Sequence, residues 1–296
     1  MSELKKLYKT IATDVWDRMK FALETNSKIS ETTLTENLLF MINKYRITSG
    51  DNSVRIYESK DEKTNGNDLE IYLEIAKNKY ILLAVQAKKL YTKKQKYTAI
   101  NHKIDADFQI DLLLNYANSK KGLALYLLYN YAPDCTHSNK EYFGCTLIEA
   151  LYIKAVYYPN TTKRWKIPTF NALHRCNHKL YAYWFKFIRP YFTFSRYAIP
   201  WHLLASNKYF KSYVDYYNAS NSQQLKEYSQ DEIIGDEWIE VKEYTGDEKV
   251  VIEPDISNDR NFVNDDNSHK RFFKPKFKMV IGLEKDNKYE ETNNLP

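Results

Sequence analysis

Two short stretches, fifteen residues apart, hold the side chains whose types and spacing could do chemistry. The first ends in Asp68-Leu-Glu70 and the second is Gln86-Ala-Lys88-Lys89. Carboxylate and amide oxygens are ligands that Mg²⁺ accepts, and a bound Mg²⁺ polarises a phosphoryl oxygen and lowers the pKa of its water. A lysine nearby can orient that water or offset charge that develops in the transition state. These residues fit hydrolysis of a phosphodiester bond; the alternative is a chance pattern in which Lys88 simply ends a strand.

A β-hairpin is the element that would bring the two stretches together. Residues 69–75 alternate between apolar and polar, as in a half-buried strand, and residues 80–85 are almost all apolar, as in a central strand. A turn centred at residues 77 and 78 places Asp68 opposite one of residues 86–88. Because side chains on a strand alternate between faces, the first and last of these three share a face.

The elements around the hairpin predict a mixed α/β core. Strand, helix and strand in succession favour a parallel crossover, so the expected core order is helix, three strands, helix, strand. Glu36 on the second helix could add a carboxylate to the site, or could act only in a capping box with Thr32 or Thr33 as the N-cap. The expected helices are residues 3–24, a helix starting near Thr33, 105–118 and 146–156, and the expected strands include 54–58 and Leu123–Tyr129.

Charge is distributed unevenly along the chain. Residues 1–220 hold 33 basic and 20 acidic residues, a net charge of +13, whereas residues 221–296 hold 11 and 18, a net charge of −7. We expect a core at 1–132, a basic, aromatic-rich helical extension at 133–220, and an acidic tail or small β module at 221–296. A basic body favours a polyanionic partner, and the tail could shield that surface or simply be solvated.

Cations and aromatic residues alternate in the basic extension. Residues 150–214 contain no Asp or Glu and eleven Lys or Arg. Phosphates attract such cations, and aromatic rings can stack on unpaired bases. A tyrosine-rich core with a solvated basic surface is the alternative interpretation. The candidate phosphate contacts on the whole chain are Lys89, Lys93, Lys94, Arg164 and Lys166.

Several classes of protein are excluded by composition. The seven glycines lie at least eleven residues apart, which excludes glycine-rich loops that cradle nucleotides. Three cysteines do not make a disulfide scaffold, and the spacing of His174, Cys176 and His178 matches no closed zinc site. The longest apolar run, Leu123–Tyr129, is far short of a membrane span, and the N-terminus lacks the apolar core of a signal peptide. We expect a soluble cytoplasmic protein without a membrane partner.

The residues of the hairpin resemble the PD-(D/E)XK nuclease superfamily. Glu36 on a helix, then Gly66-x-Asp68-x-Glu70, a hairpin and Gln86-Ala-Lys88 follow its motif, and the expected αβββαβ order is similar to its core. The closest variant is the QxK form of the Mrr-like restriction endonucleases, in which Gln replaces the usual second acidic residue. Residues 31–130 also resemble an uncharacterised bacterial family with GxDxE followed by QAK and a glutamine-bearing helix.

The resemblance implies a role for each residue. Asp68 would be the main metal ligand, Gln86 an auxiliary ligand and Lys88 the catalytic lysine, with Glu70 and Glu36 as secondary members of the site. The metal would be Mg²⁺, for which Mn²⁺ can substitute.

Two residues of the next helix extend the resemblance. Gln109 and Tyr116 are similar to the Gln and Tyr that follow the core lysine in several branches, and we count Gln109 among the nucleic-acid contacts.

The implied function is a DNA endonuclease, cutting double-stranded DNA in prokaryotic defence against foreign DNA. Gln86 is neutral where the superfamily usually has an acid, which should weaken metal affinity. It leaves open a catalytically inactive protein that binds nucleic acid or assembles with others. An RNase with the same site is a further alternative, and the sequence leaves open whether a second copy of the chain or a defence-system protein is a partner.

Overall fold

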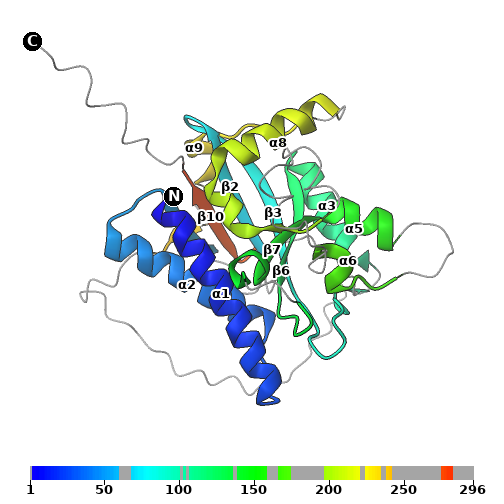
Figure 1. The fold of residues 1–296 in the computed structure, drawn as a ribbon. Coiled ribbons are helices and arrows are strands. Elements are labelled where there is room, and N and C mark those ends of the chain that lie inside the picture. The colour runs from blue at the N-terminus through cyan, green and yellow to red at the C-terminus, as the bar shows by residue number, and fades with distance from the viewer. Residues whose placement is uncertain are drawn as a thin grey trace, which may run out of the picture.

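Helices and strands of the chain form an α/β structure around one large sheet (Figure 1). The computed structural model describes residues 2–59, 68–100, 103–104, 107–135, 139–158, 166–174, 197–220, 224–234, 238–241 and 275–282. In sheet order, the strands are β8 (Ile199–Pro200), β7 (Cys145–Glu149), β6 (Leu123–Tyr129), β3 (Lys79–Lys89), β2 (Asp68–Ala76), β10 (Phe277–Ile281), β1 (Val54–Ser59) and β9 (Trp238–Glu240). A separate pair consists of β4 (Lys103–Ile104) and β5 (Asp107–Phe108).

Helices cover both faces of the sheet (Figure 1). The first two helices and α8 pack on one face, and α3 packs on the other, over β3 and β6. The helices are α1 (Glu3–Glu24), α2 (Glu31–Ser49), α3 (Gln109–Ser119), α4 (Lys140–Phe143), α5 (Ala150–Tyr157), α6 (Phe170–His174), the 3₁₀ helix η2 (Trp201–Ala205), α8 (Asn207–Ser220) and α9 (Gln230–Ile233).

The structure confirms the α/β class, the mixed sheet and the predicted crossover. Strands β2 and β3 form an antiparallel hairpin, α3 follows, and β6 then pairs parallel to β3. The helix predicted at residues 105–118 begins later than expected, because residues 107–108 pair with residues 103–104. The helix predicted at 146–156 is wrong in its first part, since β7 occupies that part and α5 begins at Ala150.

The predicted cap of the second helix is also wrong. Ser30 is the N-cap of α2, and its hydroxyl accepts a hydrogen bond from the backbone nitrogen of Thr33 at 2.9 Å. Several hydroxyl residues stand in succession here, and each is an acceptable N-cap. Glu36 is therefore not part of a capping box at this helix start.

Strand β10 lies between β1 and β2, parallel to β2 and antiparallel to β1. All five of its residues are buried. The sequence interpretation treated residues 221–296 as a tail or a separate small module, whereas β9 and β10 are strands of the main sheet. Likewise, β7 and β8 of the predicted helical extension continue that sheet at its other end.

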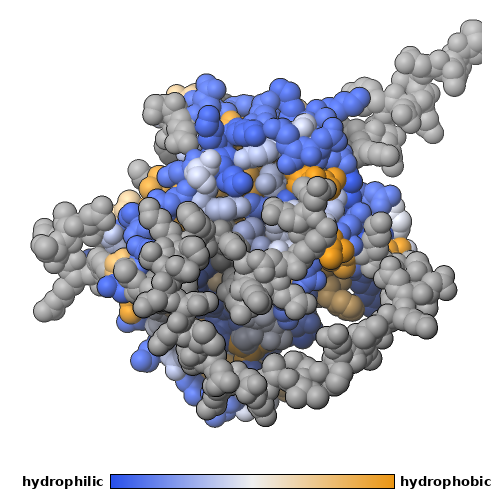
Figure 2. All heavy atoms as spheres, turned by 180° about the vertical axis from the view of Figure 1, so that it is seen from behind, coloured by the Kyte–Doolittle hydropathy of each residue, from blue (hydrophilic) through white to orange (hydrophobic). Residues whose placement is uncertain are grey.

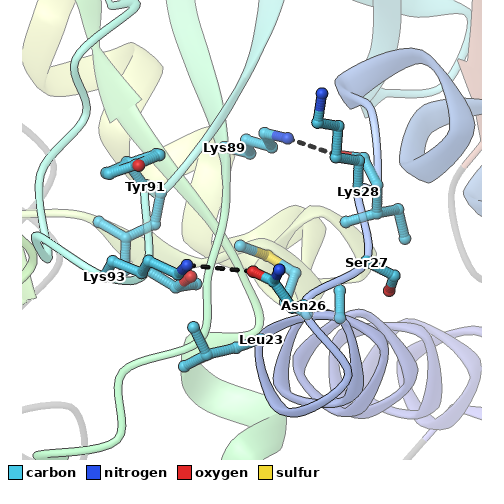
Figure 3. Close-up of a pocket in the computed structure, with 12 residues that line it drawn as sticks. Leu23, Asn26, Ser27, Lys28, Lys89, Tyr91 and Lys93 are labelled. Carbon is cyan, nitrogen blue, oxygen red and sulfur yellow. Dashed lines mark hydrogen bonds between the residues drawn. The ribbon is translucent and has the colours of Figure 1, made fainter.

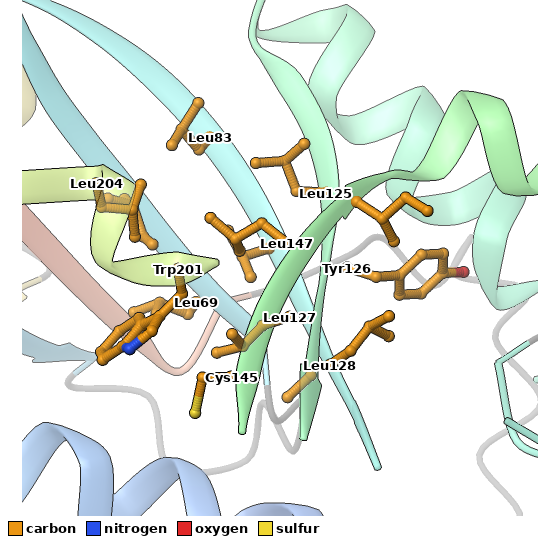
Figure 4. Close-up of a cluster of buried hydrophobic side chains, with 14 of the residues drawn as sticks. Leu69, Leu83, Leu125, Tyr126, Leu127, Leu128, Cys145, Leu147, Trp201 and Leu204 are labelled. Atoms are coloured by element: carbon orange, nitrogen blue, oxygen red, sulfur yellow. The ribbon is translucent and has the colours of Figure 1, made fainter. Parts of the chain in front are cut away.

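The core between the sheet and the first helices combines aliphatic side chains with aromatic ones, among them Trp201 (Figure 4). Trp201 of η2 lies over the sheet, close to Leu69 and Leu127. Its ring stacks on Tyr8 of α1 with 4.3 Å between centroids, and its Nε1 donates to the backbone oxygen of Tyr8 at 2.8 Å. This contact ties α1 to the segment that follows β8.

Gly144 marks the closest approach of α1 to the start of β7. A Cβ at this position would lie 1.7 Å from the backbone oxygen of Ala12, so α1 would have to move. We expect Gly144→Ala to lower the free energy of unfolding by about 2–3 kcal/mol, measured by urea denaturation. The comparison is Gly50→Ala, where φ is +66° but nothing lies within 4 Å, with an expected cost of about 1 kcal/mol. Equal losses at the two positions would contradict the steric explanation.

The surface seen from behind is mainly hydrophilic over its coloured part, and its apolar side chains gather in a few small patches (Figure 2). In the described part of the chain, no helix is both long enough and apolar enough to cross a membrane.

Candidate active site

The hairpin of β2 and β3 sets the geometry of the candidate site. Its tight turn pairs Ala76 with Lys79, and Asn78 adopts a φ of +55°, which asparagine tolerates better than most residues. The register then pairs Asp68 with Gln86, one of the three positions, 86–88, that the sequence left open. Residues 68, 70, 86 and 88 consequently share the face of the sheet on which α3 packs. Of Asp68, the structure describes the backbone and not the side chain.

Gln86 carries the observation that best fits a cation ligand. The residue is 2% exposed, and its Oε1 has no hydrogen-bond partner in the described part of the structure, which leaves out the side chain of Asp68. A buried acceptor without a partner costs about 1–3 kcal/mol, so such an atom calls for an explanation. An amide oxygen paired in register with a carboxylate residue fits the oxygen ligands of Mg²⁺. Among the described side chains, no group of three or more His, Cys, Asp or Glu residues could hold a metal ion.

Lys88 is buried and held by the start of α3. Its Nζ donates to Oε1 of Gln109, the first residue of that helix, at 2.6 Å. The lysine side chain is 3% exposed. The structure thus brings Gln109, predicted as a nucleic-acid contact, to the predicted catalytic lysine.

Glu70 lies deeper in the sheet, under α3. It is 3% exposed, and the hydroxyl of Tyr116 donates to its Oε1. Burial, and then the charge of Glu70, raise the pKa of Tyr116 well above its usual range, so its hydroxyl stays protonated and continues to donate. Both Gln109 and Tyr116 of α3 therefore contact residues of the candidate site.

Lys278 of β10 is a member of this cluster that the sequence interpretation missed. Its Nζ lies 3.9 Å from Oε2 of Glu70 and donates to the backbone oxygen of Ile233 at 2.7 Å. The ammonium also lies 4.2 Å from the centroid of the Trp238 ring. The only signal in the sequence is a lysine within a short apolar strand, which identifies no partner.

Glu36 reaches the same end of the sheet through a second lysine. Its Oε1 lies 3.1 Å from Nζ of Lys276, the residue before β10. Because Phe277 pairs with Leu69, Lys276 stands beside Asp68 in the parallel register. The pair is partly exposed, and such pairs contribute only about 0.2–1 kcal/mol, so Glu36 could exchange this lysine for another cation.

The predicted phosphate contacts separate into two groups. Lys89 is the last residue of β3, and Lys93 lies four residues further along the chain. The Nζ of Lys89 donates to the backbone oxygen of Ile29, and that of Lys93 donates to Oδ1 of Asn26 at 3.1 Å. Lys94 lies over the ring of Tyr91. Lys166 lies on a different segment, where its backbone nitrogen donates to Tyr157, and Arg164 lies outside the described residues.

His174, considered in the sequence with Cys176 and His178, is a core residue. Its Nδ1 lies 3.0 Å from the backbone oxygen of Phe170 and its Nε2 lies 2.9 Å from Oγ1 of Thr146. Both ring nitrogens are thus engaged by the protein. The other two residues lie outside the described part of the chain.

Burial lowers the pKa of His174 from 6.5 to about 3. Its contribution to stability is therefore complete above pH 6.5 and is lost as the pH falls from 6.5 towards 3. By pH 5 the free energy of unfolding has fallen by about 2 kcal/mol on account of His174. Between pH 7 and pH 5, the free energy of unfolding of the wild type should fall by about 2 kcal/mol more than that of His174→Gln, measured by urea denaturation. Equal losses would mean that His174 does not titrate in this way.

Comparison with known proteins places the chain in a family. No curated protein matches the chain significantly, and no solved structure does. One family model, described as "Family of unknown function (DUF6615)", matches residues 4–226. The matched range includes every predicted site residue and ends before β9 and β10. Since it covers well over half of the 296 residues, the chain belongs to the DUF6615 family.

Proposed function

We propose that this protein is a Mg²⁺-dependent nuclease that hydrolyses phosphodiester bonds of DNA, with Mn²⁺ able to replace Mg²⁺. The observation that carries the proposal is the pairing of Asp68 with Gln86, whose buried Oε1 has no hydrogen-bond partner among the described atoms. The resemblance of these residues and of Lys88 to the PD-(D/E)XK motif supports the same chemistry. A cytoplasmic role in defence against foreign DNA is part of the proposal and rests on that resemblance.

Each residue of the cluster has a role in this scheme. Asp68 and Gln86 would hold the metal ion, with Glu36 as a further ligand, and the ion would polarise the phosphoryl oxygen and lower the pKa of a water molecule. Lys88 donates to the attacking water or to a phosphate oxygen, where its charge stabilises the transition state.

Neighbouring residues orient the proposed metal ligands and Lys88. Gln109 fixes the ammonium of Lys88, since the two atoms are 2.6 Å apart and the lysine is buried. Glu70 is engaged by Tyr116 and lies close to Lys278, and these contacts hold β2 against α3 and β10. A fixed β2 keeps Asp68 in register with Gln86, which is the preorganisation that a metal site needs.

The test is cleavage by the purified full chain. Supercoiled plasmid, linear duplex, single-stranded DNA and RNA are incubated with Mg²⁺, with Mn²⁺ or with EDTA. We expect cleavage of DNA that requires a divalent ion and is lost in Lys88→Ala. Absence of hydrolysis of every substrate with either ion would overturn the proposal, and cleavage of RNA alone would replace DNA by RNA as substrate.

A second candidate function is binding without catalysis. Gln86 favours it, because a neutral amide gives the site less negative charge than a second carboxylate and weakens its hold on a divalent ion. This candidate predicts nucleic-acid binding that weakens steeply with salt and no hydrolysis with any divalent ion. The same cleavage series, run beside a binding titration, separates the two functions.

A further inference from the structure

A cavity of about 290 Å³ lies at the end of β3, on the face of the sheet opposite the candidate site, between the end of α1, the connection to α2 and the segment after β3 (Figure 3). Apolar side chains, among them Met19, Leu23 and Leu90, form part of its wall. Its volume is close to the lower limit for small-ligand pockets, about 300 Å³. The cavity could therefore hold one small ligand with an apolar part.

Three lysines line this cavity, Lys28, Lys89 and Lys93, and none of its lining residues is acidic. Figure 3 shows Lys89 and Lys93 extending from the β3 side to the opposite wall, where their ammonium groups bond to Ile29 and Asn26. An ammonium has three N–H donors, so each of these bonds leaves donors for a ligand. The charge of the lining favours an anion.

The end of α1 does not cancel this preference. A helix C-terminus carries partial negative charge on its last carbonyl oxygens, which would repel an anion. Here the carbonyls of residues 21, 22 and 23 accept hydrogen bonds from the backbone nitrogens of Thr25, Ser27 and Asn26, respectively. A nearby carboxylate, that of Glu31, is likewise engaged by the protein, since it accepts a hydrogen bond from the backbone nitrogen of Lys89 at 2.9 Å.

Tyr91 adds an aromatic surface at the edge of the cavity. Its side chain is 44% exposed, although its backbone is held in a tight loop: its nitrogen donates to Lys96 at 2.9 Å, and its oxygen accepts from Lys94 at 3.1 Å. A partly exposed ring on a closed loop can stack on a planar ligand with little loss of entropy. Stacking of a base on an aromatic side chain is typical of binding to unpaired nucleotides.

We propose that this cavity binds one nucleotide unit, with its base against Tyr91 and the apolar wall and its phosphate on Lys89 and Lys93. Lys88 and Lys89 are consecutive residues of β3, so the cavity and the candidate active site lie at the same end of that strand, on opposite faces of the sheet. The inference rests on the proposed nuclease function: the substrate has an unpaired nucleotide that binds at the same end of the sheet as the phosphodiester that is cut.

The test is a binding titration that does not depend on cleavage. Adenosine 5′-monophosphate, adenosine and inorganic phosphate are titrated into the full chain carrying Lys88→Ala. We expect the monophosphate to bind at least about tenfold more tightly than either part. Tyr91→Leu should weaken it about tenfold or more, within the range measured for loss of one stacked base. Lys93→Gln should also weaken it about tenfold or more, as expected for loss of a hydrogen bond to a charged group. Lys120→Gln, at an exposed lysine that does not line the cavity, should leave the affinity unchanged.

Two results would overturn the inference. One is a monophosphate affinity that neither Tyr91→Leu nor Lys93→Gln changes. The other is failure of a single-stranded oligonucleotide to displace the bound monophosphate, which would mean that a free nucleotide and not a nucleic-acid strand is the ligand. Because binding is measured in a chain that lacks Lys88, absence of nuclease activity would leave this result unaffected.

Discussion

Replacing Asp68 with asparagine is expected to slow metal-dependent DNA cleavage by at least about a hundredfold, the scale on which the loss of one preorganised electrostatic group acts. Asparagine keeps the size of the side chain and removes its charge. The residue opposite in register, Gln86, is neutral, so Asp68 supplies all the negative charge of this pair. A divalent ion bound by oxygen ligands depends strongly on that charge.

The measurement is the initial rate of plasmid cleavage over a series of Mg²⁺ concentrations. We expect the Asp68→Asn rate to recover partly at high Mg²⁺, and we expect Gln86→Glu to lower the Mg²⁺ concentration that the wild type needs. Asp215→Asn, at an exposed position on α8, is the matched control and should cut at the wild-type rate. Undiminished cutting by folded Asp68→Asn would remove Asp68 from the mechanism.

Replacing Lys278 with methionine is expected to lower the free energy of unfolding by about 3–5 kcal/mol. The side chains of Lys278 and Glu70 are 6% and 5% exposed, so the substitution leaves a buried carboxylate without the neighbouring ammonium. The cost of an uncompensated buried charge exceeds the attraction that was lost. Urea denaturation of the variant, compared with the wild type at pH 7, gives the value.

Two further variants identify the cause of the stability loss in Lys278→Met. The double variant Glu70→Gln, Lys278→Met removes both charges and should regain most of the lost stability, because no uncompensated charge remains. Lys226→Met breaks a pair with Glu232 in which both side chains are more than 40% exposed, and it should cost far less stability than Lys278→Met. A double variant as unstable as Lys278→Met would show that packing, and not charge, explains the loss.

The part of the site that lies within one hairpin could be predicted from sequence. The alternation of residues 69–75 and the position of the turn limit the residue opposite Asp68 to 86, 87 or 88, and the structure selects Gln86. The sequence was less informative about the start of α2, where several residues could serve equally well as the N-cap. Ser30 caps α2 although Thr32 and Thr33 are also acceptable caps, and only the geometry of the chain before the helix decides between them.

The contacts between distant segments could not be predicted. Strand β10 has the composition of any buried strand, and nothing in it indicates that it pairs with both β1 and β2. The partner of the buried Glu70 therefore remained unknown until the fold placed Lys278 beside it. Gln109 was identified through a resemblance, but its contact with Lys88 depends on how α3 packs over β3.

The position of β10 has a consequence for the newly synthesised chain. The hairpin that carries Asp68 and Gln86 leaves the ribosome early, whereas the strand that separates it from β1 is the last described element of the chain. At about 5–20 residues per second, the interval between Glu70 and Lys278 lasts about 10–40 s. During that time β2 has an open edge and Glu70 lacks the ammonium of Lys278. Completion of the sheet, and of the site beside it, therefore waits until β10 has been synthesised.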